Sequence, residues 1–232
     1  ADRAVLESAD LVVMNGLLEE GLEPMIRSVA QEGTAIFRTI DHVETLLLAD
    51  DHGEEGVDPH LWMDPVRVSE VLPKLTKQII EAGTLDSASL QACLDQTQLL
   101  LAKLDEEIRV MVADVPASRR KFVANHASLG YFADRYGLEM IGSVVPSTST
   151  LAAANPAYLE QLGDRMKASG ASVILVEAGQ ASKDARALAK HVGGVQVVEI
   201  FGETAGLPEN DPQVMDYVTV LRTNARLITS AL

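Results

Sequence analysis

The chain has 232 residues, 47% of them hydrophobic and 23% charged, which is typical of a folded globular protein and excludes a disordered or fibrous one. Its 34 acidic and 19 basic residues give a formal net charge of -15, which disfavours broad contact with nucleic acid or an anionic membrane surface. A cationic ligand is compatible with this charge. No run of about 18 apolar residues occurs, so no membrane-spanning helix is expected. The lone Cys93 cannot build a disulfide or a thiolate metal site alone, and its helical pattern predicts a buried position.

Short apolar runs and helical periodicity alternate along the first part of the chain. The expected elements are a strand at 9–14, a helix at about 18–32, a strand at 34–38 and an acidic loop at 50–56. From Pro65 to about Val115 the pattern is helical, with a break near 83–86. The second helical stretch, about 88–115, is longer than most helices of globular proteins and is expected to join two lobes.

Strands and helices alternate again after Pro116. The expected strands are 121–124, 139–144, 172–176 and 195–200, and the expected helices are 131–136, 156–168, 183–191 and about 212–231. Helices between apolar strands indicate a mainly parallel, covered sheet. The sequence therefore predicts an α/β protein with an N-terminal lobe over 1–83, a long linking helix over 84–118 and a C-terminal lobe over 119–232.

His60 lies in a loop that the sequence makes stiff. Pro59 and Pro65 restrict the backbone on either side, and Trp62, the only tryptophan, can wall off one side of a pocket. A neutral imidazole binds zinc near pH 7 when a carboxylate fixes its tautomer, and Asp58 and Asp64 are the candidates for that support. The alternative for such a histidine is a polar surface residue.

His126 follows an apolar strand, at the place where open α/β sheets bind their ligands. The alternative interpretation is a helix-capping segment, with Asn125 or Ser128 as the cap and His126 without a role. Position favours the binding role.

Three blocks of the sequence carry a resemblance to a known family. They are Ala9-Asp10-Leu11-Val12-Val13-Met14-Asn15-Gly16, Asp58-Pro59-His60-Leu61-Trp62-Met63-Asp64-Pro65, and His126-Ala127-Ser128-Leu129-Gly130-Tyr131-Phe132 with Tyr136-Gly137-Leu138. Together they resemble the zinc and manganese substrate-binding proteins of ABC importers, the ZnuA-like family. The likeness extends to the final helix from Tyr217 to Leu232.

The resemblance implies two α/β lobes joined by a long rigid helix, with the metal held between them. It implies that His60 and His126 are the second and third metal ligands, and that Glu203, where the family usually has aspartate, is a further ligand. A histidine at the position of His126 is typical of the zinc receptors, whereas manganese and iron receptors tend to have glutamate there. Glu177 has a family counterpart that is not usually a ligand.

Two departures from the family pattern are present. Ala127 stands where zinc receptors often have aspartate, and the family's first ligand, in a Pro-His segment, is expected upstream of Ala1. The segment around His52 is a short version of the family's His- and acid-rich loop, although a solvated acidic turn is the better interpretation. His42 and His191 are expected to be structural or exposed.

The predicted function is therefore high-affinity capture of a divalent transition metal, with Zn2+ as the transported ligand and Mn2+ second. The expected partner is the membrane permease of an ABC importer, and the chain is expected to be a monomer without enzymatic activity. Its expected location is the periplasm, or the surface of a Gram-positive cell with a lipid anchor. The alternatives are a manganese or iron receptor of the same family, a surface adhesin, and a zinc-dependent hydrolase, although no His-Glu-x-x-His or Gly-x-Ser-x-Gly motif is present.

Overall fold

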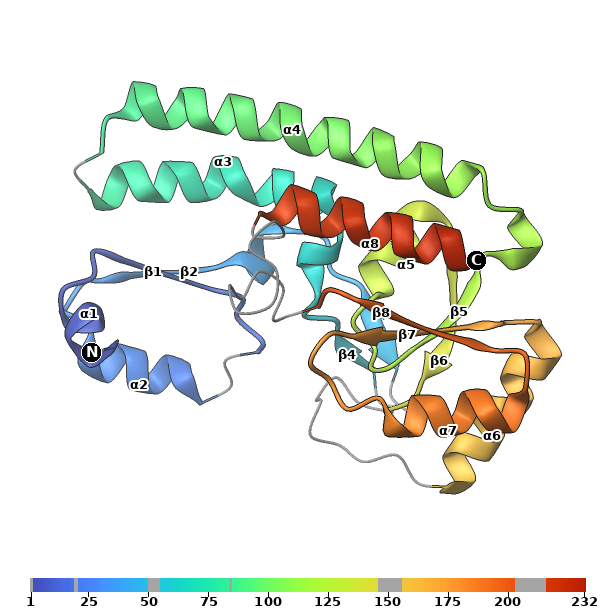
Figure 1. Ribbon diagram of the computed structural model, residues 1–232. Helices are drawn as coiled ribbons and strands as arrows, with labels where there is room; N and C mark the ends of the chain where they lie inside the picture. The colour runs from blue at the N-terminus through green and yellow to red at the C-terminus, as the bar shows by residue number, and fades with distance from the viewer. Residues whose placement is uncertain (1, 19–20, 50–54, 84, 146–155, 203–215) are drawn as a thin grey trace. The chain divides into compact units, whose positions relative to one another are not determined.

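The computed structural model describes residues 2–18, 21–49, 55–83, 85–145, 156–202 and 216–232 (Figure 1). Contacts between Cα atoms divide the chain into two units. Unit 1 comprises Ala1–Thr45 and Pro65–Ala102, and unit 2 comprises Leu46–Asp64 and Lys103–Leu232. The lobe boundaries expected from the sequence stay a prediction.

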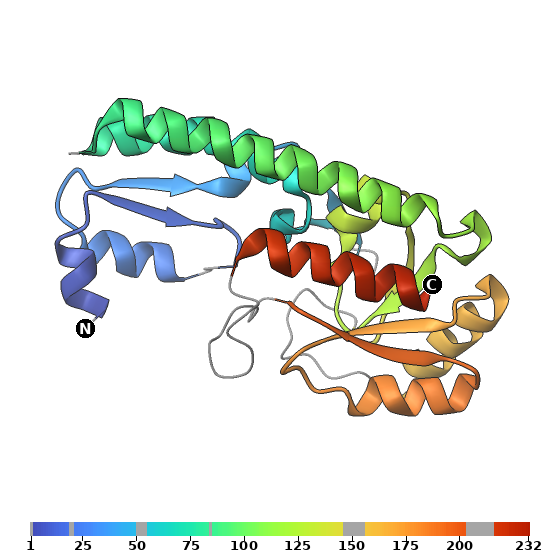
Figure 2. The same cartoon turned by 45° about the horizontal axis from the view of Figure 1, so that its top comes forward.

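Unit 1 is built on a pair of parallel strands, β1 (Leu11–Met14) and β2 (Ala35–Arg38), which pair in register from Leu11 with Ala35 to Met14 with Arg38. The helix α2 (Leu22–Val29) connects them, and α3 (Pro65–Ala82) lies on the opposite side of the pair (Figures 1 and 2). Its remaining elements are α1 (Asp2–Glu7), the 3-10 helix η1 (Thr39–His42) and the first part of α4 (Ser87–Ala113). The helix expected at about 18–32 is shorter: it begins at Leu22, directly after Gly21 in the left-handed conformation with φ of 83°, and it ends at Val29.

Unit 2 contains a four-stranded sheet in the order β6-β5-β7-β8, in which every neighbouring pair is parallel. Its strands are β5 (Lys121–Ala124), β6 (Glu139–Ser143), β7 (Val173–Glu177) and β8 (Gln196–Ile200). Its helices are α5 (Gly130–Tyr136), α6 (Pro156–Ser169), α7 (Lys183–Val192), α8 (Tyr217–Ala231) and the last part of α4. The mainly parallel α/β class expected from the sequence is confirmed.

Helices cover both faces of this sheet. On one face α6 and α7 pack against the strands through a buried cluster that includes Val123, Leu162, Met166, Ile174 and Leu188, and α8 lies on the other face (Figure 1). This two-sided burial explains why β5 and β7 read as continuous apolar runs rather than as alternating ones.

Unit 2 also contains a short antiparallel pair, β3 (Leu47–Ala49) with β4 (Glu55–Val57), and the 3-10 helices η2 (Leu61–Met63) and η3 (Ala117–Arg119). The expectation of a loop over 50–56 is therefore wrong at its end, where β4 begins. Backbone pairing forms this strand although its polar sequence carries no apolar alternation. His52 lies outside the described residues.

The long helix α4 confirms the helix expected at about 88–115. Its buried side chains include Leu94, Leu101 and Ile108, which are seven residues apart and therefore share one face. The expectation that Cys93 is buried is wrong, because Cys93 is exposed. Adjacent helical residues point in directions about 100° apart, so burial of Leu94 turns Cys93 outward.

No helix among the described residues is both long enough and apolar enough to span a lipid bilayer.

Candidate metal-binding site

The carboxyl ends of the parallel strands of unit 2 bring several polar residues to one edge of the sheet. The backbone N–H of Asn125 donates to Leu175 O at 2.7 Å, and the Val145 N–H donates to Asn125 O at 2.8 Å, so pairing continues one residue beyond β5. His126 is the next residue, and its side chain is buried. The structure thus places His126 at the ligand-binding edge predicted from the sequence.

His60 immediately precedes η2 and is fully buried. Its backbone N–H donates to Asp58 Oδ1 at 2.9 Å, and its ring Nδ1 lies 2.6 Å from the same oxygen. An ionised carboxylate only accepts hydrogen bonds, so this contact favours the tautomer with the proton on Nδ1. Nε2 is then the candidate nitrogen for a metal. Of the two carboxylates expected to support His60, Asp58 makes the contact with Nδ1, and its role at a metal stays a prediction.

Asp58 is itself held by the start of α5. The Tyr131 hydroxyl donates to Asp58 O at 2.9 Å and accepts from the Leu46 N–H at 3.2 Å. A Cβ atom on Gly130 would lie 2.5 Å from Asp58 Oδ2, closer than real Cβ atoms come to a neighbour. Only glycine at position 130 therefore lets α5 approach this carboxylate.

The two imidazoles of His60 and His126 lie side by side inside unit 2. Their ring centres are 5.4 Å apart, and the ring planes are inclined by 63°. Two imidazoles that bind one tetrahedral zinc ion through nitrogens at about 2.1 Å have ring centres about 5 Å apart. The observed spacing is close to this value, so it is compatible with a shared zinc ion.

Trp62 and Tyr217 complete this part of the site. The Trp62 ring lies edge-on to His60, with 5.2 Å between ring centres. The Tyr217 hydroxyl, from α8, donates to Trp62 O at 2.8 Å. Burial, together with the nearby Asp64 carboxylate, raises the pKa of Tyr217 far above its usual value, so the hydroxyl keeps its proton and remains a donor. This bond fixes the backbone of η2 beside His60.

Glu177, the last residue of β7, lies next to His126 and is buried. Its Oε1 is 3.4 Å from His126 Nδ1 and accepts a hydrogen bond from the Ser128 hydroxyl. A Cβ atom on Gly202 would overlap the Glu177 carboxylate, so the backbone at Gly202 packs directly against this group. The family resemblance gave Glu177 a counterpart that is not usually a ligand, and no local sequence pattern indicated the contacts of Ser128 and Gly202 with it.

The structure therefore brings His60 and His126 together, as expected from the sequence. Glu203, the further ligand candidate, lies outside the described residues. Among the residues that the structure does describe, no three His, Cys, Asp or Glu side chains are grouped so that they could hold a metal ion. The ligand roles of the three residues stay predictions.

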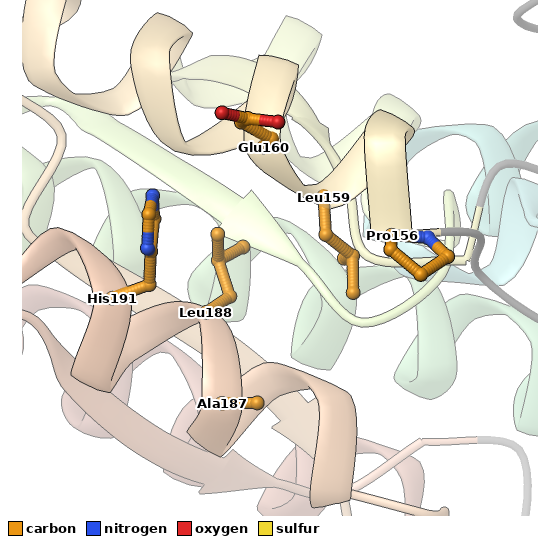
Figure 3. A pocket seen from close by; sticks show the side chains of 6 residues that line it. All are labelled: Pro156, Leu159, Glu160, Ala187, Leu188 and His191. Carbon is orange, nitrogen blue, oxygen red and sulfur yellow. The ribbon is translucent and has the colours of Figure 1, made fainter.

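A separate hollow lies between α6 and α7 (Figure 3). Its lining is mostly apolar, with Leu159 from α6 facing Leu188 from α7, and the exposed His191 lies at its side. The lining contains one imidazole and one carboxylate, that of Glu160, which is fewer donors than a zinc site requires. This hollow is therefore not the metal site.

Comparison with known proteins gives a family match over almost the whole chain. The sequence model of a family described as zinc-uptake complex component A, periplasmic, matches residues 1–231. The zinc-binding protein AdcA of Streptococcus pyogenes serotype M3 is 30% identical over 180 residues, which are 75% of this chain and 33% of AdcA. The matched part thus spans a third of the length of AdcA.

Two further similarities cover the full chain. The high-affinity zinc uptake system protein ZnuA of Bacillus subtilis is 25% identical over 245 residues, covering 100% of this chain and 74% of ZnuA. Among solved structures, a manganese-bound point mutant of a periplasmic metal-binding protein from Candidatus Liberibacter asiaticus superposes with a TM-score of 0.85. It is 18% identical and covers 100% of this chain and 84% of that one, so this likeness shows the fold alone.

Proposed function

Because the chain belongs to the family of periplasmic zinc-uptake complex component A proteins, we propose that it captures zinc and passes it to the permease of an ABC importer. The observation that carries this proposal is the buried pair His60 and His126, whose ring centres are 5.4 Å apart. The relatives AdcA and ZnuA, both named for zinc, support the choice of metal.

In this proposal His60 and His126 each give one nitrogen to the metal. The Asp58 carboxylate, 2.6 Å from His60 Nδ1, supports coordination through Nε2. Glu203 is the third ligand candidate, and its support is its match to the late carboxylate of the family pattern. A zinc site needs four ligands in tetrahedral geometry, so these three leave room for one more.

Nitrogen donors favour zinc over manganese, because manganese prefers harder oxygen ligands. A manganese or iron receptor of the same family is the second candidate, and it is supported by a similar relative named for manganese, the manganese-binding lipoprotein MntA of Halalkalibacterium halodurans, which is 22% identical over 235 residues. A zinc affinity far above the manganese affinity supports the first candidate, and the reverse order supports the second.

The proposed activity is binding without catalysis, by a monomer in the periplasm or on a lipid anchor at the cell surface. The adhesin alternative predicts no tight metal binding, and the hydrolase alternative predicts zinc-dependent turnover of generic esters or phosphates that His126→Ala abolishes. The zinc titration below separates the adhesin from the proposal, and an assay for turnover of generic esters and phosphates separates the hydrolase.

The test is a zinc titration of the metal-free protein in competition with a chelating dye at pH 7.5. We expect one zinc ion per chain with a dissociation constant below micromolar, and a loss of at least tenfold in affinity for His60→Ala and for His126→Ala. His191→Ala, an exposed histidine on α7, is the matched control and should bind as the unaltered protein does. Zinc binding no tighter than micromolar by the unaltered protein would refute the proposal, and so would undiminished binding by His126→Ala.

A further inference from the structure

We infer that Glu177 is a positioning residue that orients His126 from its Nδ1 side, and that it is not itself a metal ligand. The part of this inference that is tested by zinc affinity rests on the proposed function. The part that is tested by the tautomer of His126 needs no metal.

The surroundings of His126 resemble those of His60 with a longer contact: Asp58 is hydrogen-bonded to its histidine, whereas Glu177 is a nearby carboxylate without hydrogen-bond geometry. In each case a buried carboxylate lies beside the Nδ1 atom of a buried imidazole, at 2.6 Å for Asp58 and 3.4 Å for Glu177. A negative charge at this distance stabilises the tautomer that has its proton on Nδ1. The Asp58 and Glu177 carboxylates, from separate segments of unit 2, thus each lie on the Nδ1 side of a histidine, which leaves Nε2 as the proposed metal-binding atom of both.

The Glu177 carboxylate is held on two sides by groups that are not metal ligands. The Ser128 hydroxyl donates to Oε1, and the backbone at Gly202 packs so closely that a Cβ atom there would overlap Oε2, Cδ and Cγ. A carboxylate fixed in this way cannot turn toward a metal without breaking the Ser128 bond or moving the end of β8. It therefore acts through His126.

The position of Gly202 is fixed in turn by α8. The buried Asn224 side chain accepts from the Phe201 N–H at 2.8 Å and donates to Phe201 O at 2.6 Å. Asn224 thus pairs with both the N–H and the C=O of Phe201, the residue before Gly202, and fixes its backbone. By fixing Phe201, Asn224 holds the backbone of the next residue, Gly202, against the Glu177 carboxylate.

The first experiment measures the tautomer of His126 in metal-free protein by 15N NMR of the histidine side chains, assigned with His126→Gln. We expect the Nδ1-protonated form to dominate in the unaltered protein and to lose its dominance in Glu177→Gln. Ser128→Ala should shift the tautomer in the same direction by a smaller amount, which gives a second test if Glu177→Gln folds poorly. An Nε2-protonated form in the unaltered protein, or the same tautomer in all variants, overturns the inference.

The second experiment measures zinc affinity and the zinc coordination shell of the same proteins by X-ray absorption. We expect Glu177→Gln to weaken zinc binding by about 10-fold to 100-fold, the usual effect of removing such an outer contact, with an unchanged number of ligands. Glu199→Gln, an exposed carboxylate on the neighbouring strand β8, is the matched control and should bind normally. Loss of an oxygen ligand in Glu177→Gln would make Glu177 a ligand and overturn the inference.

The two experiments also separate this inference from the proposed function. If the unaltered protein bound no zinc, the proposed function would fail while the NMR result still decided the role of Glu177. Zinc binding by Glu177→Gln within twofold of the unaltered protein would overturn the positioning role and leave the proposed function standing.

Discussion

The substitution Gly130→Ala tests whether Asp58 must stay in place for His60 to bind metal. The added Cβ would lie 2.5 Å from Asp58 Oδ2, whereas ordinary contacts begin at 3.4 Å, so the carboxylate must retreat by about 0.9 Å. His60 Nδ1 contacts the other oxygen of this carboxylate, Oδ1, at 2.6 Å, so a shift of this size lengthens that contact to at most about 3.5 Å, past the usual limit of about 3.2 Å for an N–H···O hydrogen bond. We expect zinc affinity to fall by about 10-fold to 100-fold, or about 1.4 to 2.7 kcal/mol.

Stability should change less than zinc affinity in this variant, because the added Cβ meets the end of one side chain and no backbone atom. The assay is the same dye competition, accompanied by thermal unfolding of the metal-free protein. Gly56→Ala is the matched control, since a Cβ there has nothing within 4 Å. Zinc binding by Gly130→Ala within twofold of the unaltered protein would refute the reasoning, as would an equal loss in Gly56→Ala.

Three predictions concern the stability of unit 2 and of α4, measured by urea unfolding of the metal-free protein. Asp105 accepts two hydrogen bonds from Arg135 at 3.0 Å each, and although burial opposes the shift, these bonds hold the pKa of Asp105 below its usual value. Asp105→Asn should therefore cost about 1 to 2 kcal/mol at pH 7. Because the pKa of Asp105 is lower in the folded than in the unfolded protein, its stabilising effect is fully present above the unfolded pKa of about 3.9 and is lost as pH falls through the folded pKa. The difference in unfolding free energy between the unaltered protein and Asp105→Asn should therefore disappear over that pH range. A gap that is independent of pH from 7 to 3 would contradict this assignment. Asn224→Ala leaves the N–H and C=O of Phe201, just after β8, without their side-chain partner. The free energy of unfolding should therefore fall by about 2 to 3 kcal/mol. A loss below about 0.5 kcal/mol would show that these bonds add nothing. Leu104→Ala should lower the free energy of unfolding by about 2 to 5 kcal/mol, because Leu104 is 0% exposed. Leu99→Ala on the same helix, at 72% exposure, should change it by less than about 0.5 kcal/mol. Similar losses for both variants would contradict the burial argument.

The sheet of unit 2 could be predicted from sequence because its strands are fully buried. The apolar residues of β5 and β7 stand in unbroken runs between helical patterns, and such runs are characteristic of a covered parallel sheet. The strand β4 has no comparable signal, because Glu55–Val57 is too short and too polar to show alternation. Its formation depends on pairing with β3, which is a tertiary event.

Each histidine of the candidate site could be singled out from its own local sequence, but the contacts that hold the two histidines could not. His60 and His126 each stand in a distinctive local setting, a proline-flanked loop and a strand end. The contacts that hold them, such as Tyr131 with Asp58 and Ser128 with Glu177, join residues 73 and 49 positions apart, and no local pattern records such pairs. Gly130 and Gly202 were recognisable as glycines, but the carboxylates that require them became visible only in three dimensions.

Both histidines belong to unit 2, although His60 precedes α4 in the chain and His126 follows it. Folding of this one unit therefore places the second imidazole near the first at a high effective concentration, as in a synthetic chelating ligand. In the proposed zinc site, an ion bound to either nitrogen would reach the other without a separate rearrangement. Loss of one histidine would remove this chelate effect, so the two substitutions should not be additive: the first should remove most of the affinity that the pair provides.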